Sequence, residues 1–316
     1  MPEAVLNDAA PRLIALDWGT SSLRAYLMGE GGAVLETHRL PLGIMQVEGG
    51  DFAGAFEQAA GDWRRRWRAL PALAAGMIGS AQGWVEAPYV PCPAGLEELA
   101  GGLVPVPGAA LSIIPGVVQH GDAPNVMRGE ETQILGALSS HGDGRFVMPG
   151  THSKWVEVTG GRIRRFETHM TGELFAVLRR HSILGRFVRE DDPPPPEEVA
   201  RAAFARGVKA LRDAPSGLSP LLFSARSLVL TGGLAREASL DYLSGLLIGE
   251  ELRAGLHAMS GGLALVGDAA LCERYRQALS IFGVTAVELL GDTAAAGLWR
   301  IAGAAGLTGA GLEKNP

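Results

Sequence analysis

Cysteine is nearly absent from this sequence of 316 residues, which contains only Cys92 and Cys272. Two thiols cannot build a disulfide framework or a four-cysteine metal cluster, and no His/Cys/Asp spacing resembles a zinc site. A reducing cytoplasm is therefore the expected compartment. Lysine is also scarce, occurring at Lys154, Lys209 and Lys314 alone, so a lysine inside a motif stands out.

An excess of basic charge is lacking as well. The sequence has 28 Lys and Arg residues and 34 Asp and Glu residues, which gives a formal net charge of -6. This acidic balance argues against a nucleic-acid partner. The opening residues predict no signal peptide. The one long window without charge, residues 99–119, contains three prolines that would break a helix, so no membrane partner is expected.

Two common nucleotide-binding motifs are missing, the P-loop G-x-x-x-x-G-K-[ST] and the dinucleotide fingerprint G-x-G-x-x-G. One other turn occurs twice instead. "LIALDWGTSSLRAYL" at 13–27 and "RFVMPGTHSKWVEV" at 145–158 both run from an apolar strand through Gly-Thr-x-Ser into a second strand. Each then continues through a Gly-Gly pair, 31–32 or 160–161, into a third strand. This repetition predicts a duplicated α/β architecture whose two turns face each other across a cleft.

The chemistry of these turns suits phosphate. Glycine lets a ligand approach the backbone closely, and successive N–H groups with Thr and Ser hydroxyls offer a concave set of donors. One Gly-Thr-x-Ser alone is ordinary hairpin sequence, but two copies, with Asp17 before one and Lys154 in the other, favour a two-sided clamp on a triphosphate. The clamp residues are Gly19, Thr20, Ser21 and Ser22 in the first turn, and Gly150, Thr151, His152, Ser153 and Lys154 in the second.

Two further segments carry candidate polar groups. "AGMIGSAQGW" predicts a strand followed by a glycine-rich turn with Ser80, Gln82 and Trp84, which is either a ligand turn or a plain βα loop. "NVMRGEETQILGALSS" predicts a helix with Glu130 and Glu131 in its first turn. The helix dipole alone would favour carboxylates there, so the pattern leaves a structural role open for both.

The second half of the chain predicts more strands and helices. "MTGELFAVLRRH" places Thr171 and Glu173 at the start of a helix, with Leu174, Val177 and Leu178 facing inward. The segment "SLVLTGG", residues 227–233, is expected to form a strand.

Seven segments, in order between residues 13 and 302, resemble the actin/hexokinase/Hsp70 superfamily of ATP-binding proteins and, within it, the 2-dehydro-3-deoxygalactonokinase family. They are "IALDWGTSSLRAYL", "AGMIGSAQGW", "NVMRGEETQILGA", "MPGTHSKW", "MTGEL", "SGLLIGEEL" and "GDTAAAG". The resemblance implies an α/β fold of two duplicated ribonuclease H-like (actin-like ATPase) domains with an interdomain cleft. We expect an N-terminal domain at 1–138 on the substrate side, a second at 139–290 on the adenosine side, and a C-terminal helix at 291–316 packing back on the first.

The same resemblance implies the reaction. ATP would give its γ-phosphoryl group, with Mg²⁺, to the 6-hydroxyl of 2-dehydro-3-deoxy-D-galactonate, yielding 2-dehydro-3-deoxy-6-phospho-D-galactonate in galactonate catabolism. Glu130 matches the general base of related sugar kinases, with Glu131 as the alternative. Asp17 would orient Mg²⁺ through its waters, and Asp292 is the second candidate for the metal.

The resemblance also assigns the binding regions. Gly267 and Asp268 match the adenosine region, although the paired glycines usual in the superfamily are replaced by Val-Gly-Asp-Ala. The substrate carries a carboxylate, for which the fork of Arg24 or Arg128 is a suitable partner. Further substrate contacts are expected at Ser80, Gln82, Trp84, Thr171 and Glu173.

Other functions remain open at this stage. A kinase for a related 2-keto-3-deoxy sugar acid would differ by one inverted hydroxyl, which the sequence does not separate. An exopolyphosphatase-like phosphohydrolase also uses a Glu near two phosphate loops. A non-catalytic nucleotide-dependent regulator is a third alternative, though no basic helix-turn-helix is visible. Whether the chain forms a homo-oligomer is not readable from the sequence.

Overall fold

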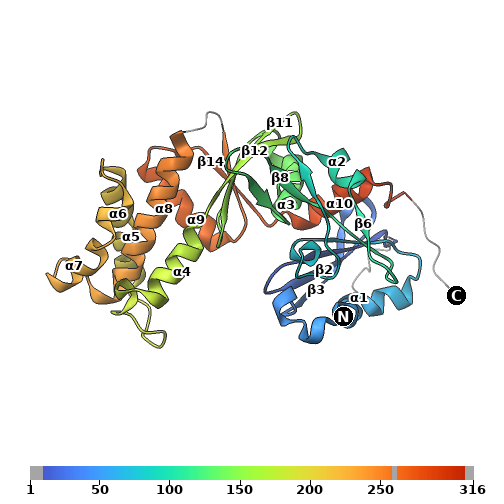
Figure 1. The fold of residues 1–316 in the computed structure, drawn as a ribbon, viewed down its shortest axis with the longest axis horizontal. Helices are drawn as coiled ribbons and strands as arrows, with labels where there is room; N and C mark the ends of the chain where they lie inside the picture. The colour runs from blue at the N-terminus through green and yellow to red at the C-terminus, as the bar shows by residue number, and fades with distance from the viewer. Residues whose placement is uncertain (1–9, 258–261, 310–316) are drawn as a thin grey trace, which may run out of the picture. The chain divides into compact units, whose positions relative to one another are not determined.

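The computed structural model describes residues 10–257 and 262–309, and the chain divides into two compact units (Figure 1). Unit 1 comprises Met1–Asp143, Glu157–Phe166 and Asp292–Pro316. Unit 2 comprises Gly144–Val156 and Glu167–Gly291. Neither unit is a continuous piece of chain. The expected boundaries at 138 and 290 stay predictions.

The main sheet of unit 1 has the strand order β3-β2-β1-β4-β7-β6. Its strands are β1 (Leu13–Trp18), β2 (Leu23–Met28), β3 (Val34–Leu40), β4 (Ala72–Ala75), β6 (Val104–Pro105) and β7 (Leu111–Ile113). The first three strands form an antiparallel meander, and β1 also pairs in parallel with β4. Four successive residues of β1, Leu13 to Leu16, are fully buried, as expected for a central strand covered on both faces.

A smaller sheet, β5-β8-β9, arises from the proline-containing window and the chain on either side of it. Its strands are β5 (Tyr89–Pro91), β8 (Gly116–Gln119) and β9 (Asn125–Met127). Among the described residues, no helix is both long and apolar enough to cross a membrane.

The helices of unit 1 are α1 (Phe52–Arg66), α2 (Leu96–Gly101), α3 (Glu130–His141) and α10 (Ala294–Ala304). Helix α10 packs against α3 at very short range. A Cβ at Gly136 would lie 2.1 Å from the carbonyl oxygen of Thr293, and a Cβ at Gly297 would lie 1.8 Å from that of Thr132. Only glycine at both positions permits this approach, which buries Leu298 and the rest of one face of α10.

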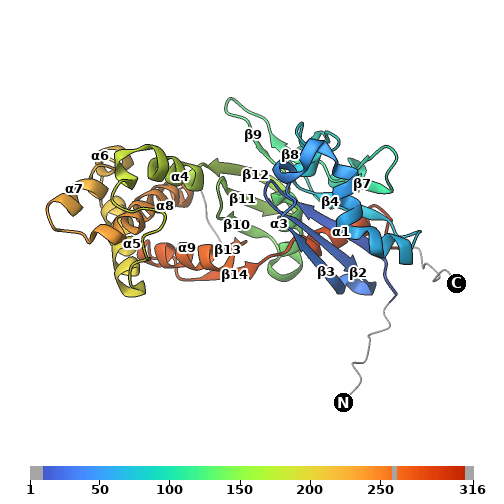
Figure 2. The same ribbon diagram turned by 90° about the horizontal axis from the view of Figure 1, so that it is seen from below.

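The second sheet has the order β12-β11-β10-β13-β14 (Figure 2). Its strands are β10 (Gly144–Met148), β11 (Ser153–Thr159), β12 (Arg162–His169), β13 (Leu263–Val266) and β14 (Val287–Gly291). Strand β13 pairs in parallel with both β10 and β14. Three sequential strands followed by two parallel ones repeat the order β3-β2-β1-β4-β7. The expected duplicated ribonuclease H-like α/β fold is thereby confirmed.

The helices of unit 2 are α4 (Thr171–His181), α5 (Glu197–Arg212), α6 (Leu218–Leu221), α7 (Ser224–Leu230), α8 (Ser239–His257) and α9 (Ala269–Ile281). Helices α4 to α7 and α9 all contact α8 (Figure 1). The core of this helical part includes Leu211, Leu243 and Leu246, all fully buried.

Two expectations for unit 2 are wrong. Residues 227–233 do not form a strand, because most of them belong to α7, where Ala225 and Leu228 pack on the α8 core at helical spacing. Leu174 and Val177 do not face inward, since each side chain is 45% exposed. Leu178 does pack on the core as expected, together with Phe175, which was not predicted.

Candidate active site

The first glycine–hydroxyl turn connects β1 to β2. The N–H of Gly19 donates to the carbonyl oxygen of Ser22 at 2.9 Å and closes the turn. Thr20, Ser21 and Ser22 are exposed. The hydroxyl-bearing residues therefore stand at the end of a buried strand and are accessible to a ligand.

The second turn connects β10 to β11 in the same way. Ser153 is buried, and its Oγ accepts the N–H of Gly150 at 3.3 Å. Thr151 and His152 are exposed. Lys154 is only 4% exposed, and its Nζ donates to the carbonyl oxygen of His152 at 3.3 Å. The ammonium group thus lies against the turn rather than in open solvent.

A glycine packs behind each turn. A Cβ at Gly43 would lie 2.3 Å from the carbonyl oxygen of Thr20, and a Cβ at Gly172 would lie 2.5 Å from that of Gly150. Any larger residue at either position would have to displace a turn. In each unit, the glycine–hydroxyl turn is therefore supported by a glycine packed closely against its backbone.

The residue after each of these glycines reinforces that support. Ile44 donates its N–H to the carbonyl oxygen of Gly19 at 3.0 Å, and Glu173 donates its N–H to that of Thr151, also at 3.0 Å. Both bonds engage a backbone carbonyl oxygen of the turn and leave the backbone N–H groups of the turn out of the contact. Backbone N–H groups are the part of a turn that recognises phosphate, so this kind of support is compatible with anion binding.

Asp17 lies within electrostatic reach of two other carboxylates of unit 1, Asp292 and Glu130. Nη2 of Arg24 is 2.5 Å from Oδ2 of Asp17, and the same guanidinium pairs with Asp292. Burial raises the pKa of Asp17, the charge of Arg24 opposes that rise, and the charges of Asp292 and Glu130 add to it. Among residues 10–257 and 262–309, no group of three or more His, Cys, Asp or Glu side chains is arranged to hold a metal unaided.

Glu130 and Glu131 begin α3 in different environments. Glu131 is fully buried, and its Oε2 accepts the N–H of Gly129 at 2.7 Å. Burial and the neighbouring Glu130 raise the pKa of Glu131 to about 8. Glu130 is half-buried, and its Oε2 accepts the N–H of Arg128 at 3.0 Å. The environment thus favours Glu130 as the carboxylate available to a substrate.

Arg128 is buried, and only part of its guanidinium is satisfied. Nη2 donates to the carbonyl oxygen of Ala87 at 2.8 Å, and the group stacks 4.3 Å from the ring centre of Tyr89. Nε and Nη1 of Arg128 have no hydrogen-bond partner among the described residues, and neither has the buried Oγ of Ser80. Nη1 points toward Gly79, where it would lie 3.0 Å from a Cβ. Unsatisfied buried donors are costly, which indicates a site for an acceptor.

The surroundings of the other predicted substrate residues do not indicate a ligand. Gln82 is exposed, and Trp84 stacks on Phe52 at 6.5 Å between ring centres. In unit 2, Thr171 donates its hydroxyl to Glu251, while Glu173 pairs with His152 of the second turn. Substrate contact by any of these side chains stays a prediction.

A cavity of about 760 Å³ lies beside the second turn, within unit 2. Its lining includes Gly150 and Thr151 of the turn, together with Asp268, Leu271 and Tyr275. The carboxylate of Asp268 also caps α9 by accepting the N–H of Leu271 at 2.9 Å. The neighbouring Gly267 binds the carbonyl oxygen of Gly291 through its N–H, and it is not one of the lining residues.

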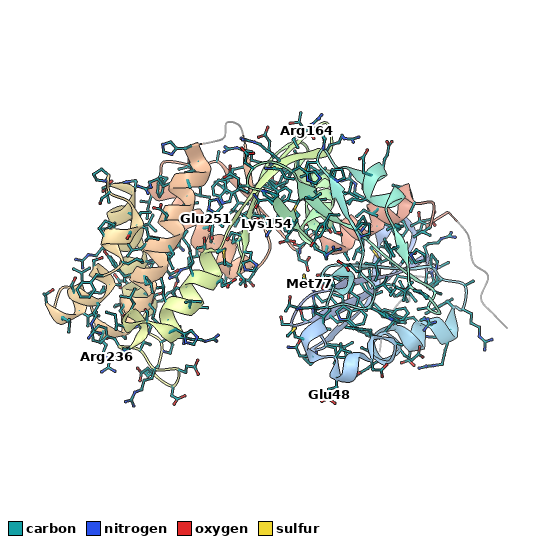
Figure 3. All side chains as sticks on the ribbon, viewed as in Figure 1. Glu48, Met77, Lys154, Arg164, Arg236 and Glu251 are labelled. Atoms are coloured by element: carbon teal, nitrogen blue, oxygen red, sulfur yellow. The ribbon has the colours of Figure 1, made fainter. Side chains whose placement is uncertain are left out.

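Sequence reasoning overlooked Glu251, which lies on α8 beside the second turn (Figure 3). This residue is only 2% exposed, although it carries a carboxyl group. The sequence carries a signal for this residue, because Glu251 continues the four-residue spacing of the buried Leu243 and Leu247 on α8. An acidic residue on the apolar face of a helix requires polar partners.

The family model of the 2-keto-3-deoxy-galactonokinases matches residues 17–301, which is most of the chain. The chain belongs to this family. A 2-dehydro-3-deoxygalactonokinase from Escherichia coli (strain K12) is 39% identical over 286 residues, covering 90% of this chain and 94% of that protein. A probable 2-dehydro-3-deoxygalactonokinase from Rhizobium meliloti is 41% identical and covers 85% of this chain and 89% of its own length.

The family fold is also matched by a solved structure. The crystal structure of a candidate 2-dehydro-3-deoxygalactonokinase from Sinorhizobium meliloti aligns with a TM-score of 0.84 at 38% identity. The alignment covers 92% of this chain and 98% of that chain. Both glycine–hydroxyl turns and Glu130 fall inside the range of the family model.

Proposed function

We propose that the protein transfers the γ-phosphoryl group of ATP to the 6-hydroxyl of 2-dehydro-3-deoxy-D-galactonate in galactonate catabolism. Membership of the family supports this reaction, since its relatives bear the name 2-dehydro-3-deoxygalactonokinase. The observation that carries the proposal is the pair of glycine–hydroxyl turns, each supported through its carbonyl groups by a glycine-containing segment.

The two turns would bind the triphosphate of ATP. Phosphoryl transfer depends on positioning and charge neutralisation more than on covalent chemistry. Backbone N–H groups and hydroxyls of both turns would supply donors, and Lys154 a positive charge. The cavity beside Gly150 and Thr151 has room for a nucleoside, and Asp268 and Leu271 line it. We assign the adenosine to this cavity.

Mg²⁺ fits the carboxylates of unit 1. Magnesium is commonly held by one or two carboxylates together with waters and substrate phosphates, so a complete protein cage is not needed. Asp17 and Asp292 offer two hard oxygen donors, and both are now paired with Arg24. These two residues would hold the ion, which would neutralise charge on the phosphates.

Glu130 would act as the general base. It begins α3 in the same unit as Asp17 and is close enough to influence the pKa of that residue. A positioned carboxylate that accepts the proton of the attacking hydroxyl contributes roughly 10²–10⁴ in rate. Glu131 is less suitable, because its pKa of about 8 leaves it mostly protonated at neutral pH.

Arg128 would bind the carboxylate of the sugar acid. A guanidinium binds a carboxylate through charge-assisted hydrogen bonds, and Nε and Nη1 of Arg128 have no hydrogen-bond partner among the described residues. Arg24, the other candidate, is engaged by Asp17 and Asp292. We therefore assign the substrate carboxylate to Arg128, and Ser80 Oγ lies buried nearby without a partner in the described structure.

A coupled assay of ADP release tests the proposed function. The purified protein is given ATP and Mg²⁺ with each of a panel of 2-keto-3-deoxy sugar acids, and with polyphosphate as a control. We expect the fastest ADP formation with 2-dehydro-3-deoxy-D-galactonate. ADP formation that does not depend on any sugar acid would exclude a kinase, and a preference for an epimer would reassign the substrate.

A further inference from the structure

A buried carboxylate connects four elements of unit 2. Oε1 of Glu251 on α8 accepts the Nε1–H of Trp155 on β11 at 2.8 Å. Oε2 accepts the hydroxyl of Tyr275 on α9 at 2.6 Å and the hydroxyl of Thr171 at the start of α4. Each oxygen thus has at least one donor, as a buried carboxylate requires.

This carboxylate fixes the direction of a chain of hydrogen bonds. The single hydroxyl proton of Tyr275 is donated to Glu251, so the Tyr275 oxygen accepts from Ser153 Oγ, 3.0 Å away. The Ser153 hydroxyl is then committed as a donor, and its lone pairs face the N–H of Gly150 at 3.3 Å. Burial and the charge of Glu251 raise the pKa of Tyr275 well above 10, which keeps its proton in place.

The same carboxylate reaches the second turn by another route. Thr171, which donates to Glu251, is followed by Gly172, whose missing Cβ lets α4 pack against Gly150. Glu251 therefore reaches the second turn in two ways. One is the hydrogen-bonded chain through Tyr275 to Ser153, and the other is the packing of Thr171 and Gly172 against Gly150.

We propose that Glu251 is a positioning residue that holds the second turn in its phosphate-binding shape. This inference rests on the proposed function, because it concerns the affinity of the turn for the phosphates of ATP. Glu251 does not itself contact the nucleotide in this scheme. It acts through Tyr275 and Ser153, and through Thr171.

The alternative is that Glu251 only stabilises the packing of α8 in unit 2 and has no effect on phosphate binding. Trp155 and Tyr275 distinguish the two roles, because each donates one hydrogen bond to Glu251 but only Tyr275 continues to Ser153. Loss of the Trp155 bond should lower stability alone. Loss of the Tyr275 bond should also weaken phosphate binding.

The test compares the binding of ATP with that of adenosine, which has no phosphate. Dissociation constants are measured by calorimetry for the wild type, Glu251→Gln, Tyr275→Phe, Trp155→Phe and Glu250→Gln. Glu250 is the matched control, since it is the adjacent residue of α8 and pairs with Arg253 away from the network. Circular dichroism establishes that each variant is folded.

For Glu251→Gln and Tyr275→Phe we expect the dissociation constant of ATP to rise about tenfold, as for the loss of one net hydrogen bond. Tyr275 also lines the adenosine cavity, but Phe keeps its aromatic ring there, so the dissociation constant of adenosine should stay nearly unchanged. Trp155→Phe and Glu250→Gln should keep the wild-type ratio of the two constants. If Glu251→Gln does not fold, Tyr275→Phe, which keeps the aromatic ring, decides the question.

Two results would overturn the inference alone: an unchanged ratio in Tyr275→Phe, or an equal loss of ATP and adenosine affinity. A Trp155→Phe variant that alters the ratio as much as Tyr275→Phe would also overturn it. A wild type that binds no ATP would instead refute the proposed function, so the two failures are distinguishable.

Discussion

Asp17 and Arg24 are direct cross-strand partners on β1 and β2, and Nη2 of Arg24 lies 2.5 Å from Oδ2 of Asp17. The same guanidinium pairs with Asp292, which comes from the far end of the chain. One positive charge thus compensates both carboxylates that we assign to Mg²⁺.

Arg24→Met should destabilise the protein without magnesium and increase its response to the ion. Asp292 and Glu130 would then repel Asp17, at a cost of about 1–3 kcal/mol, until a divalent cation neutralised the charges. Thermal unfolding with and without Mg²⁺ measures this. Arg39→Met, on the exposed neighbouring position of β3, is the control. Equal Mg²⁺ responses in wild type and Arg24→Met would contradict the assignment.

Glu131→Gln should flatten the pH dependence of stability. The pKa of Glu131 is raised from 4.5 to about 8 in the folded protein, so between these values the unfolded chain releases a proton that the folded chain keeps. Rising pH therefore favours unfolding in this window, by at most about 1.4 kcal/mol per pH unit. Urea unfolding midpoints at about pH 5 and about pH 8 measure the effect. The prediction fails if the variant retains the wild-type slope.

Glu130→Gln should lose most of its turnover, by roughly 10²–10⁴, while its affinity for ATP is kept. Gln preserves the shape of the side chain but cannot accept a proton. Steady-state kinetics and calorimetric ATP binding separate the two quantities. Glu131→Gln serves as the neighbouring control and should keep near wild-type turnover at neutral pH, because Gln mimics its protonated form. A Glu130→Gln variant with wild-type turnover would place the base elsewhere.

Arg128→Lys should raise the KM for the sugar acid by at least roughly tenfold, since the ammonium group keeps the charge but not the planar set of guanidinium donors. The KM for ATP should change little. Arg68→Lys, at an exposed position of unit 1, is the control. An unchanged KM for the sugar acid would remove Arg128 from the substrate site.

Gly172→Ala should raise the KM for ATP. Its Cβ would lie 2.5 Å from the carbonyl oxygen of Gly150 and 2.7 Å from the Cα of Thr151, so the second turn would have to move. Gly101→Ala is the control, because nothing lies within 4 Å of its Cβ position. We expect a loss of roughly 1–3 kcal/mol in apparent ATP affinity, as for overpacking a close contact. Equal kinetics in the two variants would show that the turn tolerates displacement.

The sequence allowed much of the fold to be predicted, because hydrophobic patterning and glycine positions are local signals. The buried run of β1 and the turn at Gly19 follow from residues that are adjacent in the chain. The segment 227–233 was misread because its apolar residues suit a short strand or a helix equally, and only the core beside α8 decides between them.

The site was predictable in part for the same reason. The turns and the first residues of α3 are contiguous motifs. The network of Glu251, Trp155, Thr171 and Tyr275 joins residues up to 120 positions apart, and no local pattern reports such a contact. The different pKa values of adjacent glutamates were likewise hidden, because burial at Glu131 depends on what packs over α3.

The packing of α10 on α3 through Gly136 and Gly297 has a consequence for biosynthesis. Helix α3 leaves the ribosome well before α10, and all of unit 2 is made in between. Roughly 150 residues at about 5–20 per second correspond to roughly 8–30 s during which that face of α3 lacks its partner. Unit 1 therefore lacks the helix that covers this face of α3 until all of unit 2 has been made.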